Sequence, residues 1–310
     1  MKKNLFLLFS ISLASMFLIA DTPEIDIAHF LAIATGDLAV KPGKELPDFD
    51  QVTSIEIEPV QNTKSLSVII PCHYAHAKHL YGLLRMLEEQ TVLPDEVVIS
   101  LSEYTLVPQN IMQQLEESRW AFPVTIILSE QKLPSSKNRN VASAKARGDI
   151  FMYQDADDQP HPQRVEIIKF CFEKFNLDIL MHRYIELHKE MQVALPRFER
   201  IDFMCPSDYN NSVPGKDIHN GNTAISRNVF KAFKWPDIPN HEDEIYNKIL
   251  YKYFGNRMLV YVPLIIYRNY LSVGYRHNLD PAMLHGCESN DNTNKKHHIN
   301  FAYNALLYEV

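Results

Sequence analysis

Apolar and polar positions follow a regular order in the first two thirds of this chain. Short apolar runs predict four buried strands, at residues 66–70, 96–101, 124–128 and 150–154. Between them, apolar residues recur at helical spacing and predict three helices, around residues 80–87 and at 109–118 and 136–146. We expect the first strand to stop at Pro71. The alternation of strands and helices predicts an α/β fold, with a mostly parallel sheet flanked by helices.

The pattern is less regular beyond residue 160. A helix is predicted from Pro162 to Phe175, a second at residues 242–254, and a buried strand at 259–267. Residues 181–198 fit either strands or a helix, and the sequence does not decide between them. We expect a single domain at residues 65–280, followed by a polar tail at 281–310.

The N-terminus has a different composition from the rest of the chain. Lys2 and Lys3 precede an apolar run at residues 5–20, which is shorter than the ~20 residues of a membrane-spanning helix. This pattern predicts a signal peptide or an uncleaved signal anchor at residues 1–20, followed by a stem or linker at residues 21–64. Either segment indicates a protein that is secretory or anchored to a membrane through its N-terminus.

Bulk composition excludes some classes of function. The chain has 310 residues, of which 46% are hydrophobic and 22% charged, and a formal net charge of −7 without a long basic run. These values argue against a nucleic-acid partner. Its four cysteines are widely spaced and form no Cys-x-x-Cys pair, so they predict neither a zinc site nor a disulfide-built scaffold.

Three acidic residues follow the fourth predicted strand, namely Asp155, Asp157 and Asp158. Carboxylates gathered at a strand end repel one another unless a cation lies among them, and hard divalent cations prefer such oxygen ligands. In open α/β sheets, ligands gather at the carboxyl ends of the strands, where His73 and the pair Ser102 and Glu103 are also expected. A solvated acidic turn is the alternative explanation.

Four blocks of the sequence together resemble glycosyltransferase family 2, the inverting enzymes with the GT-A fold. The opening strand and proline at residues 66–71 resemble the first block of the family, and residues 136–140 with 148–158 resemble its Ala-Arg-Asn helix and aspartate motif. Residues 240–243 resemble the acidic pair with the catalytic base, and Tyr267-Arg268 with Ser272 resembles the closing block. The resemblance implies a Rossmann-like GT-A domain, with residues 65–159 binding the donor and residues 160–280 the acceptor.

The resemblance also implies roles for individual residues. Asp243 would be the general base, with Glu242 as its neighbour or substitute, although two acids at a helix start also serve as caps. Asp157 would bind Mn²⁺ or Mg²⁺ directly, assisted by Asp155 and Asp158. The residues expected to bind the donor are Pro71, His73, Ser102, Glu103, Lys137, Arg139, Asn140 and Asp155. For Lys137 and Arg139 the alternative is a solvated helix face.

The sequence departs from the family pattern at two positions. No aspartate follows the second strand, where Ser102 or Glu103 would substitute, and Tyr270 stands where many members have a histidine. Both departures favour a rival hypothesis, a catalytically silent module that binds a sugar or nucleotide. A nucleotidyltransferase is a third possibility, but residues 72–76 lack the glycine-rich and basic phosphate loop that it needs.

The resemblance therefore predicts a metal-dependent, inverting glycosyltransferase. Its donor would be a nucleotide sugar, with UDP- and GDP-sugars expected first, and its acceptor a glycan, a protein or a lipid. The predicted secretory signal is consistent with a Golgi or endoplasmic reticulum lumen, which imports nucleotide sugars. A bacterial periplasm does not supply them, so in a bacterium the location stays open.

Overall fold

In a computed structural model, the protein is described at residues 64–188, 197–198, 200–204, 220–238, 242–269, 284–285 and 297–300. The predicted signal segment, nearly all of the stem and most of the polar tail lie outside these residues, as do Asn240, His241, Tyr270 and Ser272. Within the described ranges, no helix combines the length and the apolar character that crossing a membrane requires.

The first part of the domain alternates strands with helices, as the sequence predicts. Its strands are β1 (Leu66–His73), β2 (Glu96–Ser102), β3 (Val124–Ser129) and β4 (Ile150–Tyr153). Its helices are α2 (Ala77–Glu88), α3 (Gln109–Glu117) and α4 (Ser135–Lys145), with short 3₁₀ turns η2 (Tyr74–His76) and η3 (Tyr104–Leu106).

The second part contains two long strands, β6 and β9, together with several short ones, and its neighbouring strands are not consecutive in the sequence. Its helices are α5 (Arg164–Phe175), α6 (Arg227–Ala232) and α7 (Glu242–Tyr253), with a 3₁₀ turn η5 (Asn220–Asn222). Its main strands are β6 (Ile179–His188), β7 (Arg200–Met204), β8 (Thr223–Ser226) and β9 (Arg257–Asn269). Short strands complete it at β5 (Gln159–Pro160), β10 (Leu284–His285) and β11 (His297–Asn300).

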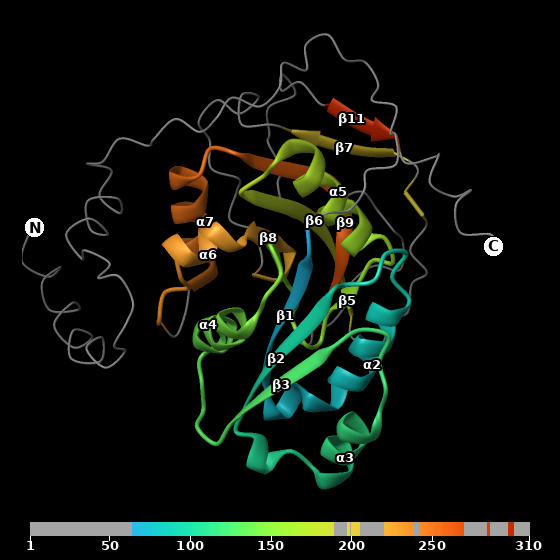
Figure 1. The fold of residues 1–310 in the computed structure, drawn as a ribbon, viewed down its shortest axis with the longest axis vertical. Coiled ribbons are helices and arrows are strands. Elements are labelled where there is room, and N and C mark those ends of the chain that lie inside the picture. The colour runs from blue at the N-terminus through green and yellow to red at the C-terminus, as the bar shows by residue number, and fades with distance from the viewer. Residues whose placement is uncertain are drawn as a thin grey trace, which may run out of the picture. The chain divides into compact units, whose positions relative to one another are not determined.

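All of these strands join one sheet, with the order β11-β7-β9-β6-β8-β4-β1-β2-β3 and with β5 and β10 paired at its side (Figure 1). The run β4-β1-β2-β3 is entirely parallel. Beyond β4, the antiparallel strand β8 connects this run to β6, which in turn lies parallel to β9. The predicted α/β class is confirmed. The parallel run brings the carboxyl ends of β4, β1 and β2 to one edge, which is where a site is expected.

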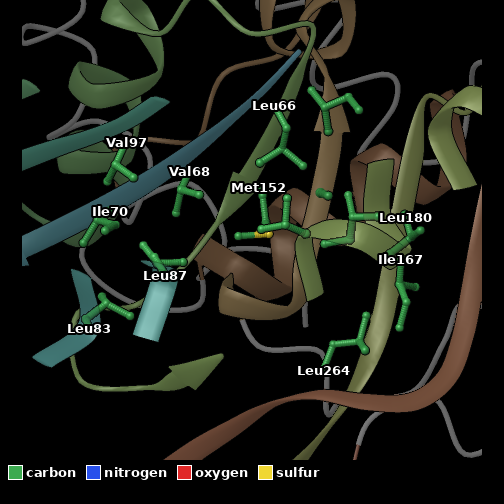
Figure 2. Close-up of a cluster of buried hydrophobic side chains, with 14 of the residues drawn as sticks. Leu66, Val68, Ile70, Leu83, Leu87, Val97, Met152, Ile167, Leu180 and Leu264 are labelled. Atoms are coloured by element: carbon green, nitrogen blue, oxygen red, sulfur yellow. The ribbon is translucent and has the colours of Figure 1, made fainter. Parts of the chain in front are cut away.

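The inner strands of the parallel run, β1 and β2, are covered on both faces. β2 is buried along its whole length, and β1 is buried at every position except His73, as parallel sheets require. Figure 1 shows α4 on one side of these strands, with α2 and α3 on the other. Leu83 and Leu87 of α2 lie beside Val68 and Ile70 of β1 in the apolar core (Figure 2).

The prediction that the first strand stops at Pro71 is wrong, because β1 continues to His73. The carbonyl of Ile69 accepts a hydrogen bond from the Gln154 amide on the β4 side. Two residues further along the strand, the nitrogen of Pro71 faces the same side. β4 has ended at Tyr153 by then, so the missing N–H costs no ladder bond.

The undecided segment at residues 181–198 contains the strand β6 over part of its length. β6 pairs with β8 on one side and with β9 on the other. Both partners lie more than thirty residues away in the sequence. The pattern within the segment therefore could not show that it forms a strand rather than a helix.

Candidate functional site

The acidic residues predicted to form a site follow β4, at the carboxyl edge of the parallel strands. Asp155 lies close to Arg139 of α4, with 2.5 Å between its Oδ1 and the Arg139 Nη2. Arg139 Nη1 lies 3.8 Å from Glu242 Oε1 at the start of α7 and also donates to the Ser135 hydroxyl. Arg139 is only 1% exposed. Its buried guanidinium therefore connects residues 155–158, called the acidic loop below, with the first turn of α7.

The ring of Trp235 packs against the Arg139 guanidinium. The Arg139 guanidinium carbon lies 5.0 Å from the centre of the Trp235 ring, which is a cation–π distance. Trp235 itself stacks on Tyr246 of α7, with ring centroids 3.8 Å apart. Because Tyr246 lies one turn after Glu242 on the same helix, this aromatic pair fixes the start of α7 relative to Arg139.

Asp155 and Asp158 direct one oxygen each toward Gly221 in η5. A Cβ atom at position 221 would lie 3.4 Å from Asp155 Oδ2 and 3.5 Å from Asp158 Oδ2. Both carboxylates therefore approach the same point of the backbone, and a glycine leaves that point open. Asp157 turns elsewhere, with its Oδ2 3.1 Å from His76 Nδ1. The hydrogen bond that the His76 ring donates to Asp157 raises the pKa of His76 despite the opposing effect of burial.

The site does not provide a complete metal cage from its own side chains. Within the described ranges, no group of three or more His, Cys, Asp or Glu side chains is arranged to hold a metal ion. Mg²⁺ and Mn²⁺, however, are commonly bound by one or two carboxylates together with phosphates of the substrate. The carboxylate oxygens that Asp155 and Asp158 turn toward Gly221 are of the type that such a cation prefers.

His73 and Glu103 form a second pair at the ends of β1 and β2. His73 Nε2 lies 2.6 Å from Glu103 Oε2, and His73 Nδ1 accepts from the Ala75 amide at 3.4 Å. With Nδ1 accepting, the neutral ring carries its proton on Nε2 and donates it to Glu103. Glu103 has the left-handed conformation, with φ 53°, which is uncommon for a residue other than glycine and often marks a functional position.

Three of the predicted donor-binding residues are engaged inside the protein. Arg139 has the contacts given above. Ser102 is buried, where its hydroxyl donates to the Cys72 carbonyl at 3.4 Å and accepts from Asn138 at 3.1 Å. The Asn140 side-chain nitrogen donates to the Trp235 carbonyl at 2.8 Å, and its side-chain oxygen accepts from the Trp235 amide at 3.0 Å. Their predicted contacts with a donor stay predictions, and the geometry adds a structural role.

The remaining predicted residues keep other positions. Lys137 is exposed and Pro71 is buried, whereas His73, Glu103 and Asp157 are partly exposed at the edge of the sheet. Glu242 and Asp243 are partly buried in the first turn of α7. The structure thus brings Asp155, Asp158, Arg139 and Glu242 into one chain of neighbours.

Sequence reasoning missed three buried polar residues beneath the site. Asn138 bonds the Ser100 and Ser102 side chains at 2.8 Å and 3.1 Å. Gln154 donates to the carbonyls of Asp155 and Asp158, at 3.0 Å each. Arg164, at the start of α5, is fully buried. Asn138 and Gln154 lie next to residues that the sequence did single out, which is a signal that could have found them, whereas Arg164 has no such neighbour.

Comparison with known proteins identifies relatives of this chain. Residues 67–232, more than half of the chain, match the sequence model of Glycosyl transferase family 2. A protein of Haemophilus influenzae described as an uncharacterized glycosyltransferase is 28% identical over 121 residues. That match covers 38% of this chain and 38% of the relative.

Solved structures of S. aureus TarS share the fold. Residues 1–349 of TarS in complex with UDP-GlcNAc match with a TM-score of 0.51 and 15% identity, and the complex with UDP matches with 0.50 and 16%. The alignments cover 67% and 66% of this chain, respectively, and 60% of each TarS chain. The chain therefore spans less than two thirds of the relatives that it matches.

Proposed function

Because the chain belongs to glycosyl transferase family 2, we propose that it transfers a sugar from a nucleotide-sugar donor to an acceptor hydroxyl group. The observation that carries this proposal is the convergence of Asp155 and Asp158 at Gly221, beside an arginine that also lies near Glu242. The UDP and UDP-GlcNAc complexes of TarS make UDP-sugars the first donors to test.

The donor diphosphate would lie above the acidic loop. Asp155 and Asp158, with Asp157 as the further predicted ligand, would hold a divalent cation there, and that cation would neutralise the charge of the departing diphosphate. Arg139 keeps Asp155 in place through the 2.5 Å contact. Burial leaves Arg139 little room to reach a phosphate, so its part would be to orient the carboxylate.

The acceptor would approach from the side of α7. Asp243, in the first turn of this helix, would take the proton of the acceptor hydroxyl as the hydroxyl oxygen attacks the anomeric carbon. Glu242 faces Arg139 at 3.8 Å and would hold the helix start in register with the acidic loop. A base on the side of the sugar opposite the diphosphate gives inversion of the anomeric centre.

A silent binding module is the second candidate, and one observation favours it. Three carboxylates of the site already have partners within the protein: Asp155 with Arg139, Asp157 with His76, and Glu103 with His73. A site whose carboxylates were all held in this way would bind a nucleotide sugar without turning it over.

Release of nucleoside diphosphate distinguishes the two candidates. The chain of residues 1–310, in mild detergent, is incubated with a panel of nucleotide sugars and candidate acceptors, in Mn²⁺, in Mg²⁺ and in chelator. We expect metal-dependent release by the wild type, with losses in Asp157→Ala and Asp243→Asn. Asp149→Asn is the matched control, because Asp149 bonds Ser65 at the opposite end of β4. Binding without release would favour the silent module, and a folded chain that binds no nucleotide sugar would refute both.

A further inference from the structure

Arg164 occupies a position that the fold alone does not explain. It begins α5, and its side chain is 0% exposed. Burial lowers the pKa of the guanidinium to about 9, although Asp158 and Asp155 act in the opposite direction. A cation in the first turn also opposes the helix dipole. A neutral side chain would avoid both costs, so the arginine calls for another explanation.

The hydrogen bonds of Arg164 join three separate segments beneath the acidic loop. Its Nη2 donates to the Tyr153 carbonyl at the end of β4, at 2.9 Å, and to the Gly221 carbonyl in η5. Its Nη1 donates to the Gln154 side-chain oxygen, and its Nε to His182 Nε2 of β6 at 3.2 Å. The planar guanidinium reaches all four acceptors at once, which a lysine could not do.

His182 fits this arrangement in one protonation state. Since its Nε2 accepts from Arg164, its proton lies on Nδ1, which is 2.8 Å from the Arg183 carbonyl and donates to it. Burial, together with the neighbouring Arg164, keeps the pKa of His182 well below its ordinary value. The imidazole is therefore a neutral acceptor that adds to the fixed geometry around the guanidinium.

Gln154 transmits this geometry to the acidic loop. Because its side-chain oxygen accepts from Arg164, its amide nitrogen must point the other way. That nitrogen donates to the carbonyls of Asp155 and Asp158 at 3.0 Å each, while the Asp158 amide closes the turn onto the Asp155 carbonyl at 3.3 Å. Arg164 thus determines the orientation of a side chain that ties both ends of the loop.

Gly221 is the second residue through which Arg164 affects the acidic loop. Arg164 bonds the carbonyl of the same glycine toward which Asp155 and Asp158 turn their oxygens. The guanidinium consequently fixes both the loop that carries the carboxylates and the backbone that they face.

We propose that Arg164 is a positioning residue of the site, which sets the shape of the loop from Asp155 to Asp158 through Gln154 and Gly221. Only the identity of the ligand that this loop receives, the diphosphate of a donor, rests on the proposed function. Arg164 touches no reacting atom, so its effect is on the geometry and charge beneath the carboxylates.

Hydrogen–deuterium exchange on the chain of residues 1–310 tests this role without any ligand. Arg164→Met removes the charge, and Arg164→Lys restores the charge without the planar fork. Gln154→Leu removes the side chain that links Arg164 to the carbonyls of Asp155 and Asp158. Lys169→Met is the matched control, because Lys169 is a buried cation of the same helix, paired with Asp95 at 2.8 Å and remote from the loop. We expect faster exchange across residues 153–158 in Arg164→Met and Gln154→Leu, partial recovery in Arg164→Lys, and no change there in Lys169→Met.

Unchanged exchange of that loop in Gln154→Leu, or equal acceleration in Lys169→Met, would overturn the proposal. If Arg164→Met does not fold, Arg164→Lys decides, because it keeps the charge and loses the planar fork: exchange of the loop equal to that of the wild type would overturn the proposal. Calorimetry with UDP and Mn²⁺ supplies the second readout: affinity should fall about tenfold or more in Gln154→Leu and Arg164→Lys and stay the same in Lys169→Met. If the wild type binds no UDP, the proposed function fails, while the exchange result still decides the role of Arg164.

Discussion

The two ends of the parallel strands both carry acidic side chains, but they hold them differently. At the amino end, Glu96 accepts hydrogen bonds from the Ser67 hydroxyl at 2.7 Å and from the backbone amides of Arg147 and Gly148. At the carboxyl end, Asp155 and Asp157 are held by the side chains of Arg139 and His76. The side chains of Asp155 and Asp157 are 25% and 19% exposed, compared with 8% for Glu96, so a ligand can reach the carboxylates at the carboxyl end more easily than the one at the amino end.

The largest expected effect is on turnover, at the carboxyl end. Asp243→Asn keeps the size of the side chain and removes its basicity, so we expect kcat to fall by about 10²–10⁴-fold, the usual contribution of a general base. Steady-state kinetics on a responsive nucleotide sugar would measure this loss. Glu242→Gln is the control on the same helix turn. A larger loss in Glu242→Gln than in Asp243→Asn would exchange their proposed roles.

The next effect is on stability, at the amino end. A Cβ atom at Gly148 would lie 2.6 Å from the Ser67 backbone nitrogen, which the close pairing of residues 65–67 with residues 148–150 does not allow. We expect Gly148→Ala to destabilise the fold by about 1–3 kcal/mol, as overpacking does, with unchanged turnover per folded molecule. Chemical denaturation measures the first quantity. Gly82→Ala is the control, because no atom lies near a Cβ at that position.

A comparable effect with a pH signature is expected for Glu96. Burial would raise the pKa of Glu96, but the hydrogen bonds from Arg147 and Ser67 outweigh it, and the pKa lies below its ordinary value of 4.5. A lowered pKa stabilises the fold above pH 4.5, and that stability is lost as the pH falls through the folded value. Glu96→Gln should therefore cost about 1–3 kcal/mol at neutral pH and flatten the loss of stability in acid. An unchanged acid profile would contradict this account.

The smallest effect is expected at His76, on the accessible edge. The bond to Asp157 raises the pKa of His76 above 6.5, so its stabilisation is complete below that pH and disappears as the pH rises through the folded value. Because the His76 side chain is 43% exposed, the pair is worth at most about 1 kcal/mol. His76→Gln should lower stability by no more than this at pH 5 and have no effect at pH 9. Thermal melts at the two pH values measure the difference.

Local sequence patterns predicted the helices and strands of the first part of the domain and the position of the acidic residues. Leu80, Leu83, Leu84 and Leu87 repeat at helical spacing because one face of α2 packs on the sheet. The acidic residues after β4 were recognised because a parallel sheet brings strand ends together. The structural environment of these leucines and acidic residues can be predicted from their immediate neighbours in the sequence.

Long-range contacts were not readable in this way. Pro71 resembled a strand end, and only the absence of β4 beyond Tyr153 allows β1 to continue. Nothing in the local sequence marks Arg164, because its partners Gly221 and His182 lie elsewhere in the sequence. The internal bonds of Arg139 and Asn140 likewise depend on Trp235, almost a hundred residues away. Pairings that the chain makes only after it folds leave no local pattern.

Binding of UDP in the presence of Mn²⁺ tests most directly whether the two ends differ in function. Calorimetric titration compares the wild type with Asp157→Ala at the carboxyl end and Asp149→Asn at the amino end. The account predicts that Asp157→Ala weakens binding about tenfold or more, while Asp149→Asn binds as the wild type does. Equal affinities in the two variants, or a folded wild type that binds no nucleotide, would contradict it.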